Sequence, residues 1–426
     1  MTRRLLLFFP VSIGLLGICC SGSHSGEPGV PVVVDFAHPL QTISGFGAAN
    51  ILPYRPDMTA EQVKKAFGTD SGQVGLSILR LSIPTERSEF ARNVPTAKLA
   101  HEMGVTIVAS PWTPPPSMKT NHDTAGGALA DTSYASYAAH LESFCDYMAE
   151  NGAPLYAVSI QNEPDITVKY ASCDWSASEM LKFVKYYAPN IGTRIIAPES
   201  FNFDRTISDS LLNDSVADSH VSIIGGHLYG EGVKGLFFSM YMSVMGGGHI
   251  FGKGLDAYPL AIDKGKEVWM TEHLAKDTSW AGALGTAKEI HDCMCAEMSA
   301  YLWWYVVRYY GPILENGEIS KRGYAMSQYA RFVRPGFVRV RATSEPQEGV
   351  YVTSYARGPK LTIIAINTGD SVVEQAFVLR NGTAASVVPY VTSLTKNCLR
   401  ANSLTISEGR FNASLEPSSI TTFVAE

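Results

Sequence analysis

The amino-acid sequence predicts an α/β protein, a (β/α)8 TIM barrel with a fused side β-sandwich. Eight β-like segments alternate with helical segments between about residues 41 and 335, as expected for parallel strands joined by helical crossovers. Over residues 336–426 the pattern changes to short alternating runs without helical periodicity, which is typical of antiparallel sheets. With 426 residues and 46% apolar content, the chain is long enough to bury both cores.

The barrel is predicted from eight strands and the helical stretches between them. The expected strands cover residues 42–49, 77–84, 106–112, 155–164, 193–200, 221–230, 267–273 and 300–307. Helical periodicity is clearest over residues 133–152, 176–192 and 285–301. Eight such units make a closed barrel the leading architecture.

The side domain is predicted from short runs near the C-terminus. These runs cover residues 350–356, 360–367, 375–380, 385–392 and 418–426. The segment 31–40 is also strand-like and precedes the barrel, so we expect it to pair with the C-terminal strands. Both ends of the chain would then build one domain.

The N-terminus resembles an export signal. Two arginines precede an apolar run ending in "LLGICC", which predicts a lipoprotein-type signal over residues 1–20 with the lipid on Cys19 or Cys20. Residues 21–30 are read as a flexible linker. The alternative is ordinary cleavage near Ser21. We therefore expect an exported monomer, anchored by lipid at a bacterial outer membrane or cell surface, or otherwise secreted or periplasmic. Membrane contact is expected only through this anchor.

The net charge argues against nucleic-acid binding, and the placement of the cysteines argues against a zinc site. A net charge of −6 argues against an electrostatic nucleic-acid binder, so no nucleic-acid partner is expected. The residues His291, Cys293 and Cys295 lie close together, but their surroundings indicate a buried helix face more than a zinc site. No metal or cofactor is predicted.

Other catalytic motifs are absent or incomplete. "GFGAAN" lacks the third glycine of a dinucleotide fingerprint, and "GGHIFGKG" (247–254) lacks the Ser or Thr of a phosphate loop. The sequence contains neither GxSxG nor HExxH.

Polar and aromatic residues gather at the C-terminal ends of the predicted barrel strands, where barrels carry their active sites. Glu163 and Glu272 end the fourth and seventh strands, so both should face one cavity. Two such carboxylates can divide acid and nucleophile roles in glycosidic bond cleavage, although either alone could be a surface glutamate. The candidate substrate-binding residues at the same mouth are Asn162, Trp112, His227, Tyr229, Trp304, Arg308, Tyr310 and Arg80.

Several motifs together resemble glycoside hydrolase family 30, particularly the bacterial glucuronoxylanases of its subfamily 8. They are "ISGFGAAN", "LRLSIP", "ASPWTPPPSMKTN", "SIQNEPD", "WMTEH", "WWYVVRYYGPI" and "SKRGYAMSQYARFVRPG". The similarity spans roughly residues 40–426. The resemblance implies a retaining enzyme that cleaves β-1,4-xylosidic bonds of (4-O-methyl)glucuronoxylan without a cofactor.

The same resemblance implies individual roles. Glu163 would be the acid/base, Glu272 the nucleophile, and Asn162 would hold the substrate 2-hydroxyl. Arg308 and Tyr310, with Trp304 nearby, would grip the glucuronic acid branch. A guanidinium suits this task because it can bind a carboxylate through two parallel hydrogen bonds.

One segment departs from the family pattern. After Glu272 the chain reads "HLAKDTSWAG", a short loop with Leu274 where an aromatic residue is expected. Carboxylate recognition would then be looser. Two alternatives remain: a family 30 hydrolase of another specificity (undecorated xylan, β-1,6-glucan or a β-glucoside), and a non-catalytic surface glycan-binding lipoprotein.

Overall fold

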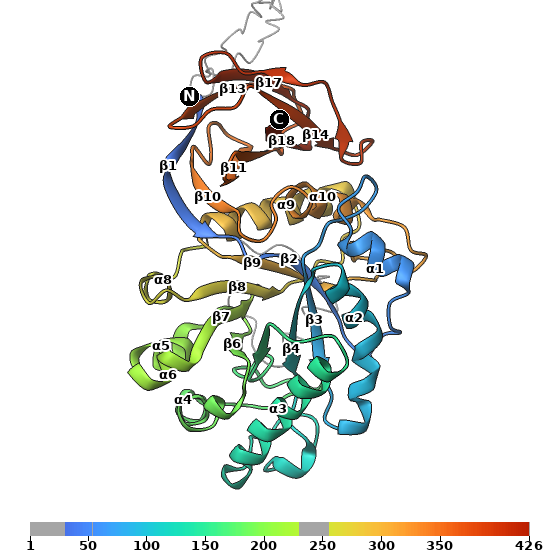
Figure 1. Ribbon diagram of the computed structural model, residues 1–426, viewed down its shortest axis with the longest axis vertical. Coiled ribbons are helices and arrows are strands. Elements are labelled where there is room, and N and C mark those ends of the chain that lie inside the picture. Colours follow the sequence, from blue (N-terminus) through green and yellow to red (C-terminus); the bar gives the residue numbers. More distant parts are fainter. Residues whose placement is uncertain (1–29, 53, 230–254, 426) are drawn as a thin grey trace, which may run out of the picture.

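The computed structural model describes residues 30–52, 54–229 and 255–425. It consists of a barrel and a side domain, which lie one above the other in Figure 1. The predicted signal (1–20), nearly all of the predicted linker (21–30) and the glycine-rich stretch 247–254 lie outside the described residues.

Eight strands close the barrel in sequence order, and every pair is parallel. They are β2 (Gly45–Asn50), β3 (Ile78–Ile83), β4 (Thr106–Pro111), β5 (Ala157–Ser159), β6 (Arg194–Ser200), β7 (Val221–His227), β8 (Glu267–Glu272) and β9 (Ala300–Tyr305). All eight predicted strands are confirmed. The fourth is shorter than predicted, because the chain leaves the extended conformation before Glu163, whose φ is 48°.

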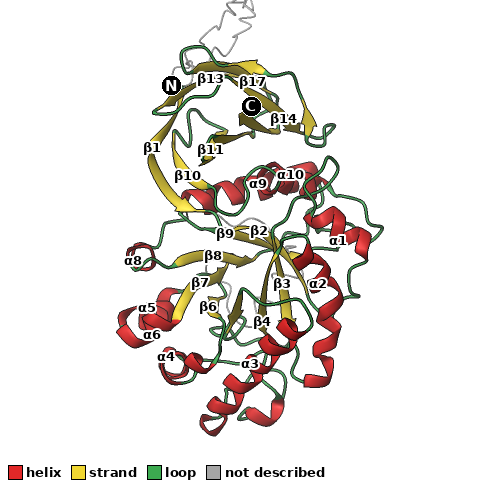
Figure 2. Ribbon diagram, in the orientation of Figure 1, coloured by secondary structure: helices red, strands yellow, loops and turns green. Residues whose placement is uncertain are grey.

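Helices cover the outside of the barrel (Figure 2). Those described are α1 (Ala60–Phe67), α2 (Val94–Glu102), α3 (Tyr134–Glu150), α4 (Ala177–Tyr186), α5 (Arg205–Asn213), α6 (Ser215–His220), α8 (Pro259–Asp263), α9 (Trp280–Cys295) and α10 (Lys321–Ala330). The start of α4 is fixed by a capping box, in which Ser176 and Glu179 satisfy each other's backbone N–H groups. The helix predicted over 285–301 ends earlier, at Cys295, and Ala300 already begins β9.

The lower half of the barrel interior is filled with apolar side chains. This cluster contains Ile78, Val108, Ala157, Ile196, Ile223, Trp269, Ala300 and Leu302, all buried. Every strand from β3 to β9 contributes at least one of them, so the barrel is a packed core and not a pore. This apolar floor supports the polar residues above it.

The side domain is one continuous curled sheet that combines the first described strand with the C-terminal strands. Its strands are β1 (Val32–Thr42), β10 (Val338–Ala342), β11 (Val350–Arg357), β12 (Lys360–Asn367), β13 (Val373–Arg380), β14 (Ser386–Thr392), β15 (Leu399–Arg400), β16 (Leu404–Thr405), β17 (Arg410–Leu415) and β18 (Ser419–Ala425). As predicted, β1 pairs with C-terminal strands, antiparallel to β10 and parallel to β13. The sheet is therefore mixed, where an antiparallel one was expected.

Helices α9 and α10 lie between the barrel sheet and the side domain (Figures 1 and 2). Trp280 Nε1 donates to the Ser418 carbonyl at 2.8 Å, and Gln328 Nε2 donates to Thr392 Oγ1 at 2.6 Å. On α9, burial lowers the pKa of His291 to about 3, and its ring packs 5.5 Å from Tyr351 of β11. The predicted buried helix face is thus an interdomain contact.

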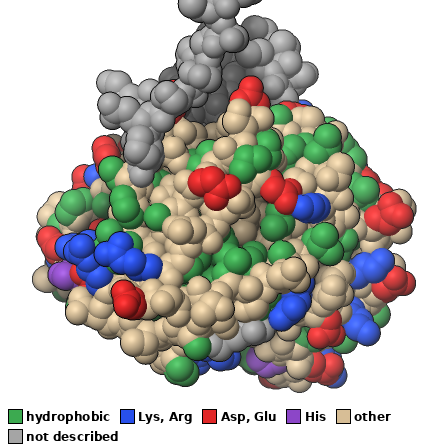
Figure 3. Space-filling model, turned by 90° about the horizontal axis from the view of Figure 1, so that it is seen from above, with side chains coloured by type: hydrophobic (Ala, Val, Ile, Leu, Met, Phe, Trp, Pro, Cys, Tyr) green, Lys and Arg blue, Asp and Glu red, His purple; other side chains and the backbone are tan. Residues whose placement is uncertain are grey.

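Figure 3 shows the face seen from the side-domain end, where acidic and basic side chains are interspersed. In the described part of the chain, no helix has the length and apolar content needed to cross a bilayer.

Candidate active site

A polar layer lies directly above the apolar floor of the barrel. Arg80, Ser110 and Ser159 each follow a floor residue by two positions, on β3, β4 and β5. Because alternate strand residues point to the same face, these side chains enter the barrel interior above that floor. All three are buried.

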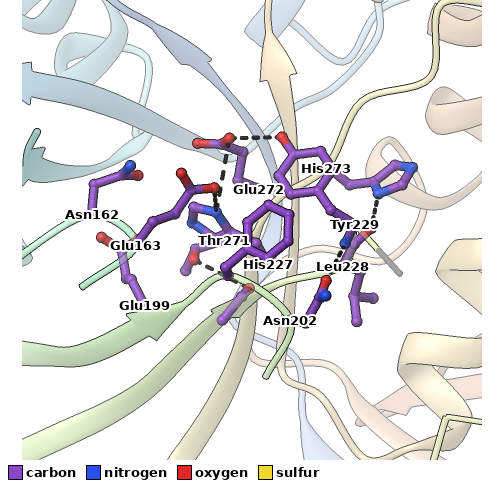
Figure 4. A network of polar contacts seen from close by, with 12 residues as sticks. Asn162, Glu163, Glu199, Asn202, His227, Leu228, Tyr229, Thr271, Glu272 and His273 are labelled. Atoms are coloured by element: carbon purple, nitrogen blue, oxygen red, sulfur yellow. Dashed lines mark hydrogen bonds and ion pairs between the residues drawn. The ribbon is translucent and has the colours of Figure 1, made fainter. Parts of the chain in front are cut away.

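Glu163 and Glu272 meet above this layer. One oxygen of each carboxylate and one ring nitrogen of His227 all lie within 4.8 Å of one another. The His227 Nδ1 atom lies 2.9 Å from Glu163 Oε1 and 3.8 Å from Glu272 Oε1 (Figure 4). Two carboxyl groups about 5 Å apart match the spacing of retaining glycosidases, whereas inverting enzymes need a wider gap.

Glu272 is held by two donors. Arg80 Nη1 donates to Glu272 Oε2 at 2.6 Å, and the Tyr229 hydroxyl donates to Oε1 at 2.7 Å. Tyr229 comes from the loop after β7, whereas Arg80 reaches across from β3. Both hydrogen bonds favour the ionised carboxylate, and the one from the charged Arg80 guanidinium is the stronger kind.

Glu163 is held by a different pair. The Tyr170 hydroxyl donates to Glu163 Oε2 at 2.5 Å, and His227 Nδ1 donates to Oε1 at 2.9 Å. The Glu163 backbone N–H donates to the Glu199 carbonyl at 3.1 Å, which fixes the left-handed turn that aims the side chain inward.

Burial and the charges of neighbouring groups shift the pKa values of Glu272 and His227. Burial is the largest influence on Glu272 and raises its pKa; His227 and Arg80 oppose the rise, and Glu163 adds to it. Burial alone would lower the pKa of His227, but Glu272 and Glu163 outweigh it, so the pKa of the imidazole is raised. Glu272 and His227 therefore retain their protons to higher pH than the isolated groups would.

Arg80 contacts side chains from several strands of the barrel. Its side chain is 1% exposed, and Nη2 donates to Asn162 Oδ1 at 2.7 Å and lies 3.3 Å from Glu199 Oε1. Its Nε donates to Ser110 Oγ at 3.1 Å. Since protein oxygens surround the guanidinium, its position favours orienting Glu272 and Asn162 over touching a substrate.

Glu163, His227 and Glu272 are of residue types that also bind metal ions in proteins. Their donor atoms are close enough for one ion. However, Arg80, Tyr229 and Tyr170 already donate to the carboxylates, and the Arg80 cation lies 2.6 Å from Glu272. This donor set fits a hydrogen-bonded acid pair better than a cation site.

Aromatic side chains line the mouth above the pair. Trp112 lies 5.5 Å from Trp304, and Trp304 lies 4.5 Å from Tyr305, measured between ring centroids. Trp112 also stacks over the Arg80 guanidinium at 4.8 Å. Beside these rings is a cavity of about 480 Å³, whose walls include Tyr54, Trp112 and Tyr170. Flat rings of this kind suit the apolar faces of sugars.

Arg308 and Tyr310 follow β9 at the same mouth. Arg308 is 30% exposed in its side chain, and its Nη1 donates to Glu315 Oε1 at 3.1 Å. Arg55 Nη2 lies 3.6 Å from the same carboxylate. Tyr310 is buried, and burial raises its pKa to about 12.

Comparison with known proteins identifies the family. A family model described as the glycosyl hydrolase family 30 TIM-barrel domain matches residues 42–186. The glucuronoxylanase XynC of Bacillus subtilis is 40% identical over 406 residues, covering 92% of this chain and 91% of the relative. The chain belongs to glycoside hydrolase family 30. It is therefore a glycoside hydrolase.

Solved structures of family 30 enzymes are also similar. The subfamily 8 xylanase Xyn30A from Clostridium acetobutylicum is 38% identical, with a TM-score of 0.83 over 93% of this chain and 99% of that one. An endoxylanase of family 30 from Clostridium papyrosolvens is 36% identical, with a TM-score of 0.81 over 93% of this chain and 100% of that one. Both the barrel and the side domain are thus family 30 features.

Two residues of this family 30 site were not predicted. Glu199 is the last residue but one of β6 and lies beside Arg80, and Tyr170 donates to Glu163. Glu199 carries the same signal as the two predicted glutamates, since it lies at the end of the predicted strand 193–200. Tyr170 lies in the loop after β5, and no periodic pattern marks it.

The loop after β8 covers residues 273–279. β8 ends at Glu272 and α9 begins at Trp280. Leu274 in this loop is buried. Leu274 therefore contributes no aromatic or polar group to the mouth.

Proposed function

We propose that this protein is a retaining endo-xylanase that cleaves β-1,4-xylosidic bonds in glucuronoxylan. The B. subtilis relative is a glucuronoxylanase, and the Clostridium structures are xylanases of the same family. The observation that carries the mechanism is the approach of the Glu163 and Glu272 carboxylates to within 4.8 Å. A single sugar ring can span that distance, but a water cannot also be seated for inversion.

In the proposed first step, Glu272 attacks the anomeric carbon while Glu163 protonates the departing glycosidic oxygen. The carbon–oxygen bond to the leaving chain breaks, and a bond to a Glu272 oxygen forms. In the second step Glu163 takes a proton from water, which displaces Glu272. Arg80 and Tyr229 orient the nucleophile, and Tyr170 and His227 orient the acid/base.

Asn162 has a separate task in this proposal. Its Oδ1 accepts from Arg80 at 2.7 Å, so its amide NH2 group is turned to donate elsewhere. A substrate 2-hydroxyl beside the nucleophile is the expected acceptor. Such hydrogen bonds strengthen in the transition state of glycoside hydrolysis.

Retention of configuration gives a direct test. Because two displacements at one carbon restore its stereochemistry, the first product released from xylan should be the β-anomer. Proton NMR recorded within the first minutes of digestion, before mutarotation, checks this. An initial α-anomer would contradict the double-displacement roles of Glu163 and Glu272.

The glucuronate branch is proposed to bind Arg308, with Tyr310 and Trp304 beside it. The Arg308 guanidinium is already paired with Glu315, so an incoming glucuronate must share or replace that carboxylate. In the loop after β8, Leu274 stands where an aromatic residue was expected, and it is buried. We therefore expect a preference for decorated xylan together with measurable activity on linear xylan.

Arg308→Ala should lower kcat/KM on glucuronoxylan by roughly 10- to 30-fold, since an exposed pair contributes less than a fully buried one. Activity on linear xylo-oligosaccharides should change little. The matched variant Glu315→Gln removes the competing carboxylate and should raise kcat/KM on glucuronoxylan by up to about fivefold. Equal losses on both substrates in Arg308→Ala would indicate a structural role, and the alternative of a family 30 enzyme for undecorated xylan would gain support.

The cellular location remains a proposal from the N-terminal sequence. The arginines and apolar run before "LLGICC" support a lipoprotein signal with the lipid on Cys19 or Cys20. Labelled palmitate should be incorporated by cells expressing the full chain. Incorporation should be lost when both cysteines are replaced by serine. Unchanged labelling in that double variant would rule out an N-terminal anchor.

A further inference from the structure

A third glutamate lies beneath the catalytic pair. Glu199 is at the C-terminal end of β6, and its side chain is 0% exposed. Its backbone has φ 59°, and the pairing of β6 with β7 shifts register between Pro198 and Ser200. A left-handed residue other than glycine is strained by about 1–2 kcal/mol, so the surrounding fold must hold it there.

The Glu199 side chain contacts Arg80, the arginine that donates to the proposed nucleophile Glu272. Its Oε1 lies 3.3 Å from Arg80 Nη2, whereas Arg80 Nη1 donates to Glu272. The two carboxylates therefore contact different nitrogens of one guanidinium. Because Arg80 also donates to Asn162, a shift of Glu199 would displace Arg80 and with it both Glu272 and Asn162.

The Glu199 backbone is hydrogen-bonded to Glu163, the proposed acid/base. Its carbonyl accepts from the Glu163 N–H at 3.1 Å, and two residues later the Phe201 N–H donates to Asp165 Oδ1 at 2.9 Å. The end of β6 and the turn that carries Glu163 thus support each other. Figure 4 shows Glu199 next to Asn162 and Glu163.

We propose that Glu199 is a positioning residue of the reaction: it anchors Arg80 and offsets part of its positive charge, so that Glu272 is oriented without being over-stabilised as an anion. This inference rests on the proposed function of the site. Glu199 has no direct contact with substrate in this role, because Arg80 and the strand ends lie around it.

The charges around Glu199 fix the direction of the effect. Arg80 of β3 and His227 of β7 are the cationic groups, and Glu163 and Glu272 are the neighbouring acids. Burial would raise the pKa of Glu199, but Arg80 and His227 outweigh it and the pKa is lowered, so Glu199 is an anion at neutral pH. A neutral side chain here would remove one of the two carboxylates that pair with Arg80, which lowers the pKa of Glu272 and of His227.

The test is Glu199→Gln in the full-length enzyme, with the pH profile of kcat/KM on glucuronoxylan as the readout. Both limbs of the profile should move to lower pH, by about one unit, since removal of a buried charge shifts its neighbours by this order. At the optimum pH of Glu199→Gln, kcat should fall by a larger factor than KM rises, because the contacts that bind the substrate in the ground state remain. A profile that keeps its position would overturn the proposal.

Two further variants serve as controls. Glu199→Asp keeps the charge but withdraws it from Arg80, so its profile should stay near that of the wild type while kcat falls. Glu267→Gln removes a carboxylate that pairs with Arg194 at 2.5 Å, at the opposite end of β8, and should leave the profile unchanged. If Glu199→Gln does not fold, Glu199→Asp carries the test alone: an unchanged kcat would then overturn the proposal.

A substrate-free measurement separates this proposal from the assignment of xylanase activity. In protein labelled with 13C-histidine, the His227 signal, assigned with His227→Gln, should titrate at lower pH in Glu199→Gln than in the wild type. If the wild type released no sugar from xylan but this shift occurred, the proposed substrate would fail while the charge role of Glu199 stood. An unshifted His227 would overturn the role of Glu199 whatever the substrate.

Discussion

Glu272→Gln is expected to lose kcat on glucuronoxylan by on the order of ten-thousand-fold or more, while the thermal midpoint stays within a few degrees. The amide has the size of the carboxylate but cannot form the glycosyl–enzyme bond. Reducing-sugar release measures the activity, and calorimetry measures the fold. A residual kcat within tenfold of the wild type would place the nucleophile elsewhere.

The matched variant Glu163→Gln separates the two roles. On xylan, it should lose about 100- to 10,000-fold, the usual contribution of general acid–base catalysis. On an aryl β-xylobioside with an acidic phenol as leaving group, the first step needs no protonation and should be nearly unimpaired. Azide should then accelerate turnover, because an anion needs no general base. The same behaviour in Glu272→Gln would mean that the roles are exchanged.

Arg80→Ala is expected to lower the free energy of unfolding by about 3–5 kcal/mol, the cost of leaving buried charges without their partner. Both Glu272 and Glu199 would lose the guanidinium that lies 2.6 Å and 3.3 Å from them. Their protonation relieves part of this penalty, which adds a loss of the ionised nucleophile and hence of kcat. Denaturant unfolding at neutral pH measures the stability change.

The control for this measurement is Arg194→Ala. Arg194 pairs with Glu267 at the N-terminal end of the barrel, and its side chain is 37% exposed. An exposed pair of this kind contributes at most about 1 kcal/mol. If Arg80→Ala were no more destabilising than Arg194→Ala, the charges of the polar layer would have to be satisfied in another way than the one described.

The barrel could be predicted from the sequence because its signals are local. Each strand is an apolar run bounded by turn residues, and the glutamates at residues 163 and 272 end two of these runs. Parallel strand ends meet at one mouth in any closed barrel, so the approach of the two carboxylates followed from counting strands. The length of the loop after Glu272 was equally visible.

Other features could not be predicted because they depend on backbone detail. Glu199 carries the same strand-end signal as Glu163 and Glu272, but its inward turn needs a left-handed residue and a register shift, which no residue pattern in this segment indicates. Arg80 was expected to bind substrate, but its four side-chain partners come together only when the ends of β4, β5, β6 and β8 surround it in the closed barrel. Tyr170 reaches Glu163 from an irregular loop.

The pairing of β1 with β10 and β13 has a consequence for how the chain folds. The Val33 N–H donates to Thr343 Oγ1, 310 residues further along. During synthesis, β1 emerges first but must wait until the barrel sequence has been made before its partners exist. Contacts this distant slow folding, since a long loop has to close before they form. Completion of the side domain should therefore be a late event, and a chain shortened at its front would leave the edges of β10 and β13 open to other strands.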